Sequence, residues 1–298
     1  MKKGWKVLII ITSVCAVLGI VLAGIGIGMG GGRTFTKWAR EGEFSFGVST
    51  PLVHLNEVEL RDEYEVITGE GNRIAVASDE TISGMELEVE GACVSIVRSD
   101  TDELRIGYEN ARELQFFVED GKLCVMQRND ILFLNEVVEL TIYVPERLEL
   151  DTVSLAMGGG KIEADRLAAR NVDITLGAGE LILREATADV ANIEIGAGSA
   201  EIRSGQFGDL YVEVGMGSFD YTGSIRGSIT AECSMGSIDF LLDGDQMDYN
   251  YDIDCAMGSI EVDHREYAGI AAEKHIDNDA AWNCSLECAM GGITLRFR

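Results

Sequence analysis

LGAGELIL (176–183), IGAGSAEI (195–202), VGMGSFDY (214–221) and CSMGSIDF (233–240) are successive copies of one pattern, in which a glycine precedes an alternating apolar and polar run. Three further copies read AMGGGKIEA (156–164), CAMGSIEV (255–262) and CAMGGITL (288–295). From the first to the fifth copy the shared glycine recurs every 19 residues, and the last two intervals are 22 and 33. Such a period is typical of stacked structural repeats. The shared glycines are Gly160, Gly179, Gly198, Gly217, Gly236, Gly258 and Gly291.

Apolar residues occupy fixed positions around each shared glycine, at five and three residues before it and at two and four residues after it. This alternation indicates strands with one buried face. The inward parity shifts at the glycine, so we expect a bend there, made with a positive φ. The pattern predicts an all-β fold, a single-stranded parallel β-solenoid of about 19 residues per coil. The position three before the glycine holds Met157, Leu176, Ile195, Val214, Cys233, Cys255 and Cys288.

The N-terminal residues predict a membrane anchor. Residues 7–32 carry no charge, and a helix of about 23 residues spans about 35 Å, enough for a hydrocarbon core of about 30 Å. Lys2, Lys3 and Lys6 precede this run and favour a cytoplasmic N-terminus. We expect residues 1–6 to be a cytoplasmic tail, residues 7–32 a single transmembrane helix, and the rest extracellular at the cell membrane. A cleaved secretory signal ending at Ala23 is the alternative.

The remaining chain divides by regularity. Residues 33–83 lack a clean period and are expected to form a stalk and lead-in with partial order at best, whereas 84–298 form one β-solenoid. Within it, 84–147 are irregular N-terminal coils, with a hairpin at Asp120-Gly121, and 148–298 are regular coils. An insertion at about 264–282 contains AGIAAEKH (268–275), which is expected to form a short helix. The insertion is either a cap, which we favour, or a binding loop.

Charge limits the choice of partner. Residues 41–298 contain 18 basic and 51 acidic side chains, a net charge of −33. This balance disfavours nucleic acid and anionic polymers, and it favours cations or a basic partner.

Two outward columns are acidic and would stack into ladders. We considered calcium binding between their oxygens, because a cation would offset the repulsion between like charges; a solvated face is the favoured alternative. No other cofactor is expected. The candidate ligands four residues before the glycine are Glu194, Glu213, Glu232 and Asp254, and those three after it are Glu201, Asp220, Asp239 and Glu261.

The cysteines of the repeat share one inward column. Stacking would place Cys233, Cys255 and Cys288 about 4.8 Å apart at Cα, within disulfide range. The same column holds Met, Leu, Ile and Val in other coils, so buried thiols are favoured over disulfides, and zinc is less favoured still.

No catalytic constellation is readable. His54, His264 and His275 are dispersed and accompany no nucleophile motif, and no phosphate-binding loop occurs.

The segments Gly217-Ser218-Phe219-Asp220, Gly236-Ser237-Ile238-Asp239 and Gly258-Ser259-Ile260-Glu261, behind a membrane-anchored N-terminus, resemble the bacterial putative-adhesin family, a domain of unknown function. The resemblance implies a right-handed β-solenoid on the cell surface and supplies no catalytic residues. We expect a non-enzymatic surface module, adhesin-like or a scaffold, that binds an unidentified cell-envelope or protein partner. An envelope-stress regulatory membrane protein is one alternative. A polysaccharide-acting β-helix enzyme is another, disfavoured because the acids are spread out and tryptophan occurs only at positions 5, 38 and 282.

Overall fold

The computed structural model describes residues 58–74, 82–128, 137–268 and 272–298, all of which belong to one compact unit spanning 49–298. The predicted cytoplasmic tail, transmembrane helix and cleavage site lie outside the described residues. Within the described ranges, no helix is long and apolar enough to cross a membrane.

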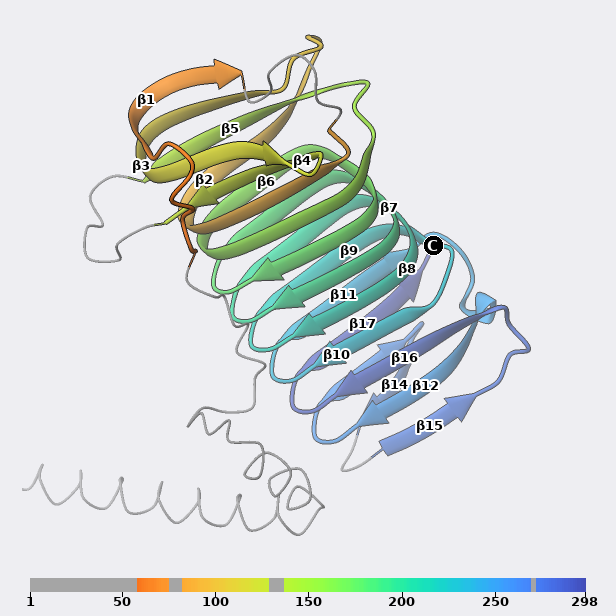
Figure 1. The fold of residues 1–298 in the computed structure, drawn as a ribbon. Helices are drawn as coiled ribbons and strands as arrows, with labels where there is room; N and C mark the ends of the chain where they lie inside the picture. Colours follow the sequence, from red (N-terminus) through yellow and green to blue (C-terminus); the bar gives the residue numbers. More distant parts are fainter. Residues whose placement is uncertain (1–57, 75–81, 129–136, 269–271) are drawn as a thin grey trace, which may run out of the picture. The chain divides into compact units, whose positions relative to one another are not determined.

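The described residues form an all-β, solenoid-like fold whose strands belong to one sheet (Figure 1). Strands β6 (Leu150–Leu176), β7 (Glu180–Ile195) and β8 (Ser199–Val214) pair in parallel, and each residue lies in register with the residue 19 positions further along the chain. The next coil is split into β9 (Ser218–Ile225) and β10 (Ile229–Cys233). Pairs of adjacent exposed residues within β7, Arg184-Glu185 and Asp189-Val190, mark corners, so each coil presents three inward-facing arms.

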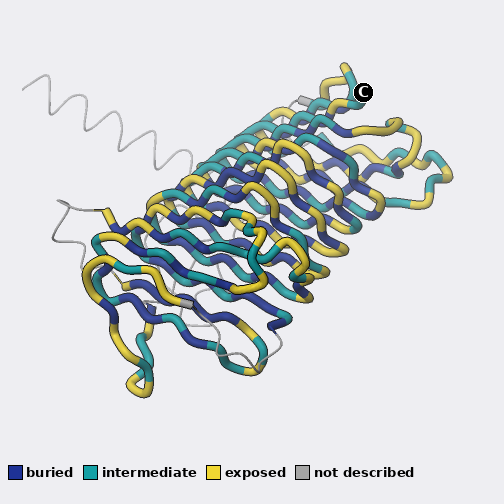
Figure 2. Tube along the Cα trace, turned by 90° about the horizontal axis from the view of Figure 1, so that it is seen from above, coloured by how far each residue is buried: buried dark blue, intermediate teal, exposed yellow. Residues whose placement is uncertain are grey.

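The apolar columns form the core, because parallel in-register pairing places equivalent residues over one another. Leu176, Ile195 and Val214 are at most 2% exposed, and Figure 2 shows buried and exposed positions alternating along the coils. Phe219 and Phe240 are fully buried and pack edge to face, with ring centroids 5.9 Å apart. Fully burying one such side chain stabilises the fold by about 1.5–3 kcal/mol.

The shared glycines are required by close approach rather than by backbone conformation. Among the seven, only Gly160 has a positive φ, so the expected left-handed bend is wrong for the other six. A Cβ on Gly217 would lie 2.1 Å from the carbonyl oxygen of Gly198, and a Cβ on Gly236 would lie 2.2 Å from that of Gly217. Adjacent coils therefore stack too tightly for any side chain at the shared-glycine position itself.

The last two coils do not follow sequence order. Strand β10 pairs with β16 (Trp282–Cys288), which in turn pairs with β12 (Tyr249–Cys255). Likewise β17 (Gly292–Phe297) lies between β11 (Ser237–Leu242) and β13 (Ser259–Val262). The expected neighbours Cys233 and Cys255 are thus separated by Cys288, and the sequential stacking that we expected is wrong here. A short 3₁₀ helix, Gln246–Asp248, precedes β12.

Antiparallel strands close the C-terminal end of the stack. Strand β14 (Arg265–Ala268) pairs with β13 through a turn at Asp263-His264, where both φ angles are positive, and β15 (Ala272–Ile276) pairs with β12. Residues 272–275 are therefore strand, and the predicted helix over AGIAAEKH is wrong for them. Residues 272–276 pair instead with the edge of β12, which would otherwise lack a partner strand on that side. Strands β14 and β15 cover the edges of β13 and β12, and the choice between a cap and a binding loop stays a prediction.

The N-terminal end is closed in the same way. Strand β2 (Gly84–Ser99) pairs in parallel with β6 on one side and with β4 (Lys122–Gln127) and β5 (Val138–Pro145) on the other. Strand β3 (Arg105–Glu119) covers β4 and β5 in antiparallel fashion, and Asp120-Gly121 forms the predicted hairpin turn.

Residues 58–74, assigned above to the stalk, pack against this end instead. Strand β1 (Ile67–Ile74) pairs antiparallel with β3, and Val58 is 6% exposed. The Tyr64 ring stacks on Phe117 at 3.8 Å, and the Gln115 amide donates to the carbonyl oxygens of Arg61 and Tyr64. These contacts are scattered in sequence and leave no period to detect.

Candidate functional site

The first acidic ladder runs along the outer face of the arm that precedes each shared glycine. Its register partners are Glu194 with Glu213, Glu213 with Glu232, Glu232 with Glu287, and Glu287 with Asp254. Because β16 is inserted between β10 and β12, Glu287 makes this ladder continuous, and Glu273 on β15 extends it beside Asp254.

Stacking perturbs the carboxyl groups of this ladder. Partial burial, followed by the charges of Glu232 and Glu194, raises the pKa of Glu213. Burial, with the charges of Glu232 and Asp254, likewise raises the pKa of Glu287. The Tyr211 hydroxyl donates to Glu213 Oε2 at 3.3 Å. In the part of the chain that the structure describes, no Lys, Arg or His forms an ion pair with Glu194, Glu213, Glu232, Glu287 or Asp254.

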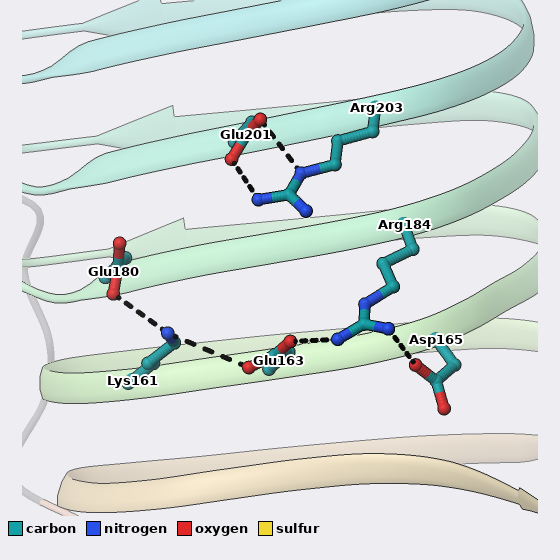
Figure 3. Close-up of polar contacts among 7 residues, drawn as sticks. All are labelled: Lys161, Glu163, Asp165, Glu180, Arg184, Glu201 and Arg203. Carbon is teal, nitrogen blue, oxygen red and sulfur yellow. Dashed lines mark hydrogen bonds and ion pairs between the residues drawn. The ribbon is translucent and has the colours of Figure 1, made fainter.

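The second acidic ladder follows the glycine and has two unlike halves. In the first coils basic side chains neutralise it (Figure 3): Arg184 lies 2.8 Å from Glu163, and Arg203 makes two bonds of 2.9 Å to Glu201. Lys161 joins Glu163 and Glu180 at 3.7 and 3.4 Å. The hydrogen bonds from these arginines hold the pKa of Glu163 and of Glu201 below the ordinary value.

In the later coils the second ladder lacks this compensation. Asp220 pairs in register with Glu201 and Asp239, and burial followed by the charges of Asp239 and Glu201 raises the pKa of Asp220. Among described residues, no basic side chain forms an ion pair with Asp220, Asp239 or Glu261. Thr294 of the inserted coil lies between Asp239 and Glu261, so this ladder is interrupted where the first is continuous.

Four methionines lie in a row at the same corner, and we call them the methionine ridge: Met216, Met235, Met290 and Met257, in spatial order. The amide of each contacts the adjacent coil: Met235 N donates to Gly215 O at 2.8 Å, Met290 N to Ser234 O at 2.8 Å, and Met257 N to Ala289 O at 2.7 Å. Met216, Met290 and Met257 are 54%, 50% and 55% exposed, whereas Met235 is partly buried.

The ridge continues into a shallow groove on the earlier coils. There Ala178 and Ala197 occupy the equivalent position, and the groove of about 500 Å³ is lined by these alanines, by Gly179 and Gly198, and by Met216 at its end. The methionine column is readable in the four copies as the residue before the shared glycine. The sequence did not predict that these methionines form a surface row, because that depends on their exposure and on the order in which the last coils stack.

The cysteine column is buried and outside this surface. Cys288 lies in register with both Cys233 and Cys255, and all three are at most 2% exposed free thiols. The hydrogen bond with the Cys288 thiol lowers the pKa of Cys233. Burial raises the pKa of Cys284, which is also fully enclosed.

The ladders contain no preformed metal site. Among the described residues, no three His, Cys, Asp or Glu side chains form a group that could hold a metal ion. Calcium binding therefore stays a prediction, tested by comparing the melting temperature in calcium and in chelator. Of the histidines, His54 lies outside the described residues, and the His275 ring lies 2.6 Å from Asp252 with both side chains 68% exposed.

Residues 57–280 match the family model described as Toastrack DUF4097, which is about three quarters of the chain. The chain belongs to the Toastrack DUF4097 family. No curated protein matches its sequence.

Solved structures are similar to the Toastrack domain at low identity. A "putative cell adhesion protein" from Clostridium sporogenes is 15% identical, over 78% of this chain and 100% of its own, with a TM-score of 0.36. A "putative adhesin" from Bacteroides fragilis is 13% identical, over 76% and 96%, with a TM-score of 0.42. A "putative lipid binding protein" from Parabacteroides distasonis is 16% identical, over 76% and 97%, with a TM-score of 0.42. These descriptions apply to those proteins and are not transferred to the Toastrack domain.

Proposed function

We propose that the protein is a non-enzymatic module, anchored in the cell membrane by residues 7–32, whose extracellular Toastrack domain binds a partner of the cell envelope along the flank of its coils. The observation that carries the proposal is the outer surface of the later coils, from Tyr211 at the end of β8 through β9–β13 and the inserted β16 and β17. Exposed methionines lie there between two columns of carboxylates that no basic side chain of the described residues neutralises. A surface of this kind costs stability through like-charge repulsion, and a bound partner offsets that cost.

The chemistry of the flank favours binding over catalysis. Catalytic carboxylates of glycoside hydrolases act as a pair across one scissile bond, with one of the two protonated by its environment. The acids here instead repeat once per coil along the stack, as Glu194, Glu213 and Glu232 do. Repeated equivalent side chains suit an extended contact with another macromolecule.

The topology is tested with intact cells that express the full-length chain with a C-terminal epitope. External protease is expected to remove the epitope while a cytoplasmic marker remains intact. An epitope that stays protected in intact cells but is cut after lysis contradicts the proposal.

The binding role is tested by placing a photo-crosslinking amino acid at Met235 in the flank, with Met247, an exposed methionine outside it, as the control position. We expect a covalent adduct in living cells from position 235 and a much weaker one from position 247. Equal adducts from both positions, or none from either, argue against a binding flank.

A further inference from the structure

The glycine corner brings three columns together in the later coils. Within one coil, Met216 lies three residues after Glu213 and four residues before Asp220, and both acids face outward. Extended chain spans at most about 3.6 Å per residue, so each carboxylate column lies within about 11–14 Å of the ridge. A long basic side chain centred over the ridge can reach either column. The same arrangement recurs at Met235 with Glu232 and Asp239, and at Met257 with Asp254 and Glu261.

Apolar exposure and uncompensated charge occur on the same coils. The earlier coils carry Ala178 and Ala197 at the ridge position, and there Arg184 and Arg203 neutralise the second ladder. Among the coils that carry methionine, only the inserted coil has an arginine at the equivalent position, Arg296, and this side chain forms no ion pair with a described residue. Asp220 is followed in the same arm by Thr222, and Asp239 by Leu241. The later coils thus expose flexible apolar side chains between negative charges, a combination that a partner with both apolar and positive groups complements.

The backbone amides at this corner are already hydrogen-bonded. The amides of Met235, Met290 and Met257 all donate to carbonyl oxygens of adjacent coils, so an incoming chain finds no free strand edge here. Recognition must proceed through side chains, as when an amphipathic helix lays its apolar face on a partner. Coils repeat at about 4.8 Å and helical turns at about 5.4 Å, so four methionines match about three helical turns.

We propose that the methionine ridge and the two acidic ladders form a docking surface for a cationic amphipathic helix, which lies along the stack with its apolar face on the methionines and its Lys or Arg side chains over the carboxylates. The inference rests on the proposed function and adds to it the face used and the chemistry of the partner. Methionine suits this contact because an unbranched thioether adapts to different apolar surfaces.

The test uses the full-length chain in nanodiscs of zwitterionic lipid, with empty nanodiscs as the blank. Three fluorescent 18-residue probes are compared at physiological salt: a Lys/Leu amphipathic helix, a scrambled peptide of the same composition, and a Glu/Leu helix. We expect the cationic helix to bind at least about tenfold more tightly than the scrambled peptide, and the acidic helix not to bind beyond the blank. Equal binding of the cationic helix and the scrambled peptide would show mere charge attraction and would overturn the proposal.

Two sets of variants assign the face. Serine at all four ridge positions is expected to weaken the cationic helix at least about tenfold, whereas Met247→Ser, an exposed methionine outside the ridge, leaves binding unchanged. Glu213→Gln with Glu232→Gln is expected to weaken binding and reduce its salt dependence, whereas Glu185→Gln with Asp189→Asn at other corners is not. Wild-type binding by the fourfold serine variant contradicts the assignment. Circular dichroism of each variant confirms that it is folded.

Failure of the docking surface for a cationic helix is distinguishable from failure of the proposed function. If position 235 forms adducts in cells but no cationic helix binds, the flank is a binding surface for a partner of other chemistry. If the C-terminal epitope is protected in intact cells, the surface role fails whether or not the peptide binds.

Discussion

Gly291 and Gly292 are neighbours whose replacement by alanine is expected to have opposite effects. A Cβ on Gly291 would lie 2.3 Å from Gly236 O and 2.5 Å from Cys233 Sγ. A Cβ on Gly292 would find its nearest neighbour, Ser259 Oγ, at 3.7 Å, which is ordinary contact. Neither glycine has a positive φ, so backbone conformation does not separate them.

The magnitude follows from the contacts that Gly291→Ala would displace. Overpacking costs about 1–3 kcal/mol, and the displaced carbonyl of Gly236 accepts from Gly292 N at 3.1 Å, a hydrogen bond worth about 0.5–1.5 kcal/mol. We expect a loss of about 2–4 kcal/mol, which lowers the melting temperature by roughly 4–16 °C for a domain of this size. Gly292→Ala is expected to gain about 0.4–1 kcal/mol, because alanine reduces the entropy of the unfolded chain.

The assay is thermal unfolding of the full-length chain, followed by circular dichroism, with both variants measured beside the wild type. Equal melting temperatures for the two alanine variants would refute the claim that the inserted coil stacks directly on Gly236. A large loss confined to Gly292→Ala would refute it as well.

Three further predictions concern the ladders and the cysteines. Burial and like charges raise the folded-state pKa values of Glu213, Glu287 and Asp220 above their unfolded values, so the folded state binds more protons. The melting temperature should therefore rise as pH falls from 7 towards 5, and Glu213→Gln should reduce that rise. A melting temperature that does not change with pH contradicts this prediction. The arginine-paired Glu163 and Glu201 have lowered pKa values, so their contribution should be lost as pH falls below about 4.5, and Glu163→Gln should lessen the acid-side loss. Cys288→Val should change the free energy of unfolding by less than about 1.5 kcal/mol, because Val214 occupies the same column. Cys288→Ser should cost about 1–3 kcal/mol, because it buries a hydroxyl. Equal denaturation midpoints for the two variants would argue against a dry core.

The period of the sequence predicts most of the stack, because the same side-chain columns determine which residues are buried, which face of the strand they lie on, and how neighbouring strands are aligned. Leu176, Ile195 and Val214 could be aligned by counting 19 residues, and parallel pairing places them where the count requires. The acidic ladders follow from the same count. The glycine column was also correctly located, although its reason is the distance between coils and not a positive φ.

The order of the last two coils could not be read in this way. The sequence CAMG begins at both Cys255 and Cys288, so either segment could lie beside Cys233 with its side chains in the same columns. The choice is made by the antiparallel strands β14 and β15, which cover β13 and β12 and leave the other side of that coil for β16 and β17. Pairing of this kind depends on distant edges and leaves no period in the sequence.

The candidate surface was only half visible from the sequence. The sequence predicted the acidic ladders but not their ion-pair partners. Arg184 pairs with Glu163 of the neighbouring coil and Arg203 with Glu201 of its own strand, and among the described residues no basic side chain pairs with Asp220. The methionines were present in the quoted segments, and their greater exposure separates them from the buried valine or cysteine two residues earlier.

The central claim is that coil order places Met216, Met235, Met290 and Met257 in one row at the glycine corner, and cysteine pairs at these positions test it most directly. Adjacent ridge positions lie about 4.8 Å apart at Cα, within the disulfide range, and alternate ones about 9.6 Å apart, outside it. Under mild oxidation of the full-length chain, the pair at 235 and 290 is predicted to form a disulfide, and the pair at 235 and 257 is not. A disulfide between 235 and 257, with none between 235 and 290, would contradict the inserted coil and the docking surface built on it.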